Sequence, residues 1–72
     1  MNRHIIFECE GTRFDLVMTT DPYGGDLVIW TGGSGMRARV WRYFEGDRLQ
    51  PLSENCSPYD GQLIFAYLEA NQ

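Results

Sequence analysis

Residues 36–44 read MRARVWRYF, and they alternate between two kinds of side chain. Successive side chains of a β-strand point to opposite faces of the sheet, so the pattern predicts a strand with two unlike faces. One face carries guanidinium groups and rings, from Arg37, Arg39, Trp41 and Tyr43, and the other carries Met36, Ala38 and Val40. A row of rings and guanidinium groups on one face of a strand either binds a partner or packs against another part of the chain. We therefore expect this strand to contribute both to the fold and to a contact surface.

A β-hairpin is the strongest local prediction, and it comes earlier in the chain. Glu10-Gly11 can form a two-residue turn, in which glycine supplies the positive φ that such turns require. The turn sets the pairs Cys9 with Thr12, Phe7 with Phe14, Ile5 with Leu16, and Glu8 with Arg13. This register collects one apolar face, made of Ile5, Phe7, Cys9, Phe14, Leu16 and Met18. Pairing and turn chemistry therefore agree on the same hairpin.

A second hairpin is predicted around the glycine-rich segment 32–35. Closing it symmetrically gives the pairs Thr31 with Met36, Ile29 with Ala38, and Leu27 with Val40. The same register sets Trp30 opposite Arg37 and Val28 opposite Arg39. We therefore expect the aliphatic side of this hairpin to join the core, and the row of rings and Arg to gain Trp30 on the other side.

The last third of the chain predicts a short strand and a helix. Residues 48–52 can pair back as a fifth strand, which Pro51 restricts to a sheet edge because proline lacks an amide hydrogen. Ser57-Pro58 is typical of a helix start, and the helix should run to about Ala70. Its apolar stripe is Leu63, Ile64, Tyr67 and Leu68. We therefore predict a single α+β domain over residues 1–72: an antiparallel meander of four to five strands with one C-terminal helix on one face, or else a sheet curled into a small barrel.

Charge and composition limit the classes of function. The net charge is −4, but residues 36–48 hold four Arg against Glu45 and Asp47, so this segment sums to +2 and the rest to −6. An acidic chain disfavours binding to nucleic acid through overall charge. Two cysteines, no apolar N-terminal leader and no apolar run of about 20 residues lead us to expect a reduced cytoplasmic protein without a membrane segment.

Catalytic and metal-binding patterns are not evident in the sequence. His4 is the only histidine, and alternation places it on the opposite side of its strand from Cys9, so no nucleophilic pair is supplied locally. Two cysteines with 46 residues between them give no zinc spacing. We therefore expect no enzyme activity, no metal and no cofactor.

Three interpretations of the row of rings and Arg remain open. It can be a second core covered by loops, a protein interface, or a platform on which single-stranded nucleic acid stacks. We favour a protein-binding module, a small inhibitor or regulator comparable in type, though in no particular motif, to those of phages and mobile elements. Its partner would be a larger protein or a protein–nucleic acid complex, with a homodimer as the alternative. The candidate contact residues are Trp30, Arg37, Arg39, Trp41 and Tyr43, together with the acidic Asp21, Asp26, Glu45 and Asp47.

Overall fold

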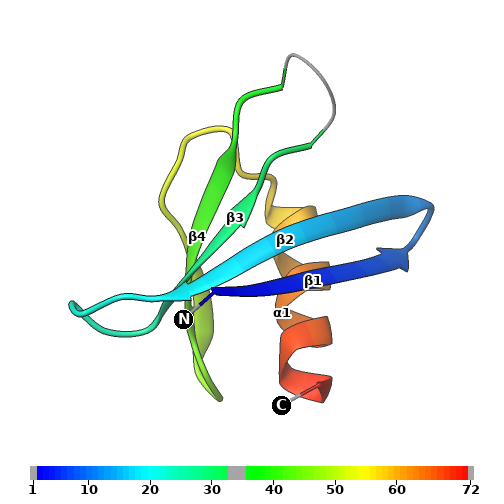
Figure 1. The fold of residues 1–72 in the computed structure, drawn as a ribbon. Helices are drawn as coiled ribbons and strands as arrows, with labels where there is room; N and C mark the ends of the chain where they lie inside the picture. Colours follow the sequence, from blue (N-terminus) through cyan, green and yellow to red (C-terminus); the bar gives the residue numbers. More distant parts are fainter. Residues whose placement is uncertain (1, 33–35, 72) are drawn as a thin grey trace.

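The computed structural model describes residues 2–32 and 36–71 as one five-stranded antiparallel sheet and one helix (Figure 1). The elements are β1 (Asn2–Cys9), β2 (Thr12–Thr20), β3 (Asp26–Trp30), β4 (Arg39–Phe44), β5 (Arg48–Pro51) and α1 (Pro58–Ala70). The strands lie side by side in chain order, so β1 and β5 form the two edges of an open sheet. The predicted α+β meander is confirmed, and the sheet does not close into a barrel.

The first hairpin has the predicted turn and register. Glu10 and Gly11 have φ values of 53° and 79°, and two successive positive values are typical of the turn whose twist matches that of the flanking strands. The pairs Phe7 with Phe14 and Glu8 with Arg13 are present as expected. The register predicted from the turn chemistry and the alternating pattern is therefore confirmed.

The second hairpin differs from the prediction by two residues. Ile29 pairs with Val40, where we expected Ala38, and Trp30 pairs with Arg39. Strand β4 begins only at Arg39, and residues 33–35 of the predicted turn lie outside the described residues. A long glycine-rich connection does not impose a register, so cross-strand packing decides it. A slip of two residues keeps every side chain on its own face, so Trp30 and Arg39 still share one side of the sheet.

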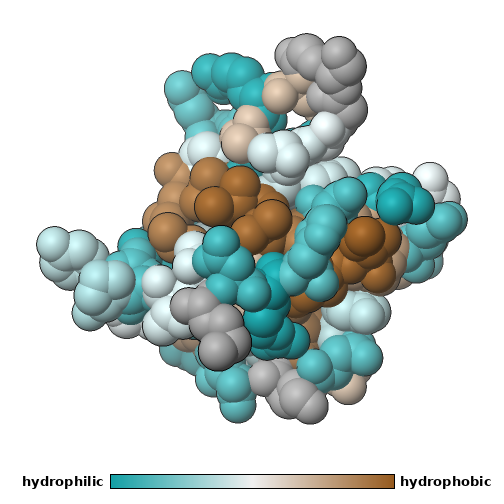
Figure 2. Space-filling view, in the orientation of Figure 1, coloured by the Kyte–Doolittle hydropathy of each residue, from teal (hydrophilic) through white to brown (hydrophobic). Residues whose placement is uncertain are grey.

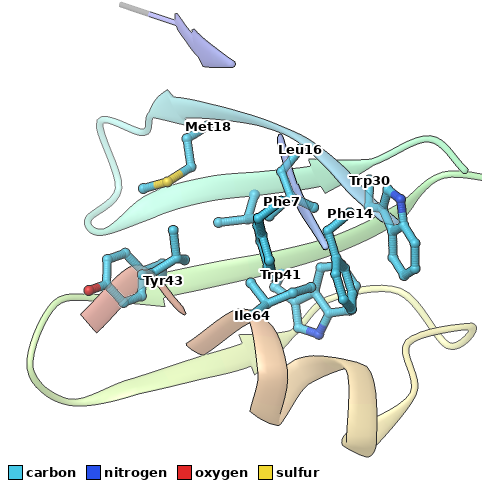
Figure 3. Packing of buried hydrophobic residues seen from close by; sticks show 10 residues of the cluster. Phe7, Phe14, Leu16, Met18, Trp30, Trp41, Tyr43 and Ile64 are labelled. Atoms are coloured by element: carbon cyan, nitrogen blue, oxygen red, sulfur yellow. The ribbon is translucent and has the colours of Figure 1, made fainter. Parts of the chain in front are cut away.

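The choice of the core face in this hairpin was wrong. Leu16 of β2 pairs directly with Trp30 of β3, and Met18 pairs with Val28, so the apolar face of the first hairpin continues into the row of rings. Helix α1 covers this inner face and buries Ile64 and Leu68 against it (Figures 1 and 3). The buried cluster is Phe7, Phe14, Leu16, Met18, Val28, Trp30, Trp41, Tyr43, Ile64 and Leu68.

Helix α1 begins and ends with capping interactions. Ser57 is the N-cap, its Oγ accepts a hydrogen bond from the Asp60 amide, and Pro58 occupies the first turn, as predicted. At the other end the amide of Asn71 donates to the Leu68 carbonyl. Among the described residues, this helix is too short to cross a bilayer.

Candidate functional site

The rings predicted to form an outer contact surface lie inside the protein. Trp30, Trp41 and Tyr43 are only 6%, 1% and 2% exposed, and their side chains project between the sheet and α1 (Figure 3). Trp30 packs on Phe14 with ring centroids 4.7 Å apart. The expectation that these rings are presented to a partner is therefore corrected: in this arrangement they are core residues.

Arg39 is buried together with the rings, whereas Arg37 is not. The Arg39 guanidinium lies over the Trp30 ring, with Cζ 3.8 Å from the ring centroid, and the nearest carboxylate, that of Asp60, is 4.0 Å away. Its Nε is enclosed and has no hydrogen-bond partner among the described residues. Arg37 is exposed and precedes the strand, so the predicted four-residue row is reduced to three strand residues.

The four acidic candidates lie in three different surroundings. Asp21 forms an ion pair with Arg42 at 2.8 Å, and hydrogen bonds from the Tyr23 amide and from Arg42 hold the pKa of Asp21 below its ordinary value. Asp26 is half-buried in β3. Glu45 and Asp47 are exposed, and Asp47 pairs with the neighbouring Arg48. Asp21 therefore has a structural role, while Glu45 and Asp47 remain available at the surface.

The helix-free face of the sheet carries an aliphatic row, of which we had assigned Ile29 and Val40 to the core. Val17 pairs with Ile29, and Ile29 pairs with Val40, so the three side chains lie next to each other across β2, β3 and β4. The Leu52 amide continues the row by donating to the Val40 carbonyl at 2.8 Å. Ile6 of β1 and Leu52 are 47% and 44% exposed. We call these five residues the aliphatic row; Figure 2 shows apolar side chains gathered on this face among hydrophilic ones.

Polar side chains border the aliphatic row. His4 lies next to Val17 in the strand register and pairs with Asp15, while Arg42 of β4 pairs with Asp21. Within the described residues, no group of three or more His, Cys, Asp or Glu side chains could hold a metal ion. Because Ile6 is the strand partner of Asp15, the His4–Asp15 contact separates Ile6 from the apolar centre formed by Val17, Ile29 and Val40.

A groove that the sequence did not reveal lies between the β4–β5 edge and the start of α1. It has a volume of about 360 Å³, and its walls come from β4, β5, the connection to the helix and the helix itself. The lining residues are Trp41, Leu49, Pro51, Cys56, Ser57, Pro58, Gly61, Gln62 and Phe65. The free thiol of Cys56 donates to the Val40 carbonyl at 3.3 Å, so it is held in the wall.

Comparison with protein-family models, with curated proteins and with solved structures finds no match for this chain. The aliphatic row and the groove are therefore the two surfaces of this protein from which a function can be proposed.

Proposed function

We propose that this protein is a non-enzymatic protein-binding module that occupies a surface of a larger protein through the helix-free face of its sheet. In this role it acts in the cytoplasm as an inhibitor or regulator. The observation that carries the proposal is the aliphatic row, in which Ile6 and Leu52 remain 47% and 44% exposed although each is large and apolar.

The composition of this face supports a protein partner. Protein interfaces have an apolar centre with a polar rim. Here Val17, Ile29 and Val40 are adjacent at the centre, the His4–Asp15 contact lies between them and Ile6, and the Arg42–Asp21 pair lies on another side. Covering apolar surface stabilises a complex by about 25 cal/mol for each Å² removed from water, before the costs of association. The five residues of the row come from five neighbouring segments, so a partner can contact them together.

The inner face supports this choice of surface over nucleic-acid stacking. Bases stack on open ring faces, and the rings of Trp30, Trp41 and Tyr43 are packed under α1 and Arg39. The chain is also acidic, with a net charge of −4. Both facts favour a protein partner on the opposite face.

The proposal is tested by affinity capture from a lysate of the source cells with tagged wild type and two variants. Ile6→Glu/Leu52→Glu places charge in the aliphatic row at half-exposed positions, so the fold should persist and circular dichroism should be unchanged. The matched control is Tyr23→Glu, which alters a side chain that is 92% exposed and lies outside the row. We expect a protein retained by wild type and the control to be lost, by at least about tenfold, from the double variant. Equal retention by all three proteins would contradict the proposed surface.

A further inference from the structure

We propose that the groove beside α1 binds a small, neutral and mainly apolar molecule through one hydrogen-bond acceptor, which accepts from the indole N–H of Trp41. This site is separate from the aliphatic row and does not depend on the proposed protein partner. Its volume, about 360 Å³, falls in the range of about 300–1,000 Å³ that is typical of small-molecule pockets.

The first support is the indole nitrogen of Trp41. Trp41 is 1% exposed, and its side chain extends from β4 toward α1 (Figure 3). The indole N–H can only donate, and a buried one usually has an acceptor, yet no described residue accepts from it. Among the described residues, Arg39 Nε is the side-chain nitrogen that is both fully enclosed and without a partner. Trp41 Nε1 also lacks a partner but is not fully enclosed, so it is accessible from the groove.

The second support is Gly61, which lies directly against this nitrogen. Glycine within a helix lowers stability relative to alanine, and Gly61 has no positive φ to require it. A Cβ built on Gly61 would meet only Trp41 Nε1, at 3.4 Å, which is an ordinary contact distance. Neither backbone strain nor a clash therefore requires glycine here; its effect is to leave open the space over the indole N–H.

The lining residues define the chemistry of the ligand. None of the nine carries a charge, so a charged ligand would enter without a counter-ion, which is unfavourable. The Ser57 Oγ accepts from the Asp60 amide and keeps its own proton to donate, and the Cys56 thiol donates to the Val40 carbonyl. The Gln62 amide, the other polar group of the lining, belongs to an exposed residue. The rings of Trp41 and Phe65 form flat apolar walls. A planar apolar body with one carbonyl or ether oxygen therefore fits the lining.

Nuclear magnetic resonance of the indole N–H groups tests the proposal with acetophenone as the probe. The chain has two tryptophans, so two indole cross-peaks are expected, and Trp30→Phe assigns them. We expect acetophenone to shift the Trp41 peak downfield in a saturable way and to leave the Trp30 peak in place. Ethylbenzene, which has a similar shape and no acceptor, should bind about 3- to 10-fold more weakly, and benzoate should also bind more weakly.

Two helix variants separate binding from stability. Gly61→Ala fills the space over the indole nitrogen and removes a helical glycine, so it should abolish the saturable shift while raising Tm by several degrees. The matched control, Ala66→Gly, alters an exposed position of the same helix and should lower Tm while keeping the shift. The proposal is overturned if no probe moves the Trp41 peak, if acetophenone and ethylbenzene bind equally, or if Gly61→Ala still shows the saturable shift. Loss of this site would leave the proposed partner surface untouched, because no residue is shared between them.

Discussion

The two faces of the sheet are built from different side chains and are covered to different extents. The inner face buries two tryptophans, a tyrosine and Arg39, whereas the outer face leaves Val17, Ile29 and Val40 half-buried, with no helix or strand of the described residues over them. Hydropathy alone would predict that the aliphatic face is the buried one. Burial therefore follows the location of α1 and not hydropathy, because the face that the helix covers is the one that carries the large rings.

The strongest test of this comparison removes bulk from each face in turn. Trp41→Ala deletes a fully buried ring, so we expect the free energy of unfolding to fall by about 3–5 kcal/mol, which is enough to unfold many domains of this size. Val40→Ala on the outer face should cost only about 1 kcal/mol. Urea unfolding followed by circular dichroism measures both values. A cost for Val40→Ala as large as that for Trp41→Ala would show that the outer face is also core.

A second test asks whether the inner face needs the charge of Arg39 or only its bulk. The guanidinium is nearly desolvated; among the described residues, its closest carboxylate is 4.0 Å away and Nε has no partner. Replacing a poorly paired buried charge by an apolar group of similar length is often neutral or stabilising, so Arg39→Met should change the free energy of unfolding by less than about 1 kcal/mol. Arg39→Ala leaves Trp30 uncovered and should cost about 1–3 kcal/mol.

The matched pair of variants at Arg39 is measured by the same urea unfolding. If Arg39→Met is as destabilising as Arg39→Ala, the charge itself stabilises the fold through Trp30 and Asp60. The inner face would then be an electrostatic as well as an apolar core.

The sequence predicted those elements whose signals are local. The turn at Glu10-Gly11 fixed the first hairpin because both residues have the positive φ that the turn needs, and Ser57-Pro58 fixed the start of α1 because cap and first turn are adjacent in the chain. The boundaries and pairings in these two regions therefore follow from neighbouring residues alone.

The face of the second hairpin could not be predicted in the same way. Alternation separates Val28, Trp30 and Trp41 from Leu27, Ile29 and Val40, but both sets are apolar enough to form a core. The pairing of Leu16 with Trp30 decides between them, and it is a contact between strands joined by an irregular loop. The groove is also non-local, since its walls come from four segments. The two candidate surfaces could therefore not be predicted from the sequence, because both are formed by contacts between residues that are far apart in the chain.

The smallest expected effect concerns pH, and it compares one carboxylate from each face. On the inner side, Glu69 of α1 accepts hydrogen bonds from the Tyr43 hydroxyl and the Gly46 amide, which lower the pKa of Glu69 below its ordinary value of 4.5. On the outer side, Asp21 accepts from the Tyr23 amide and Arg42, which lower the pKa of Asp21 below 3.8. Both carboxylates therefore stabilise the fold when ionised.

The sign of the pH dependence follows from these directions. The unfolded chain takes up protons at the ordinary pKa values, before the folded protein does, so stability is complete above about pH 5 and falls as the pH drops through 4.5 and 3.8. Glu69→Gln and Asp21→Asn each replace one of these carboxyl groups by an amide that does not titrate. In urea unfolding, the free energy of unfolding of each variant should therefore fall less steeply between pH 5 and 3 than that of wild type. Glu54→Gln, at an exposed residue, is the control and should leave the slope as in wild type. If only Asp21→Asn changes the slope, the Tyr43 hydroxyl does not stabilise the ionised Glu69 carboxylate in solution. The helix would then be held on the inner face by apolar packing alone.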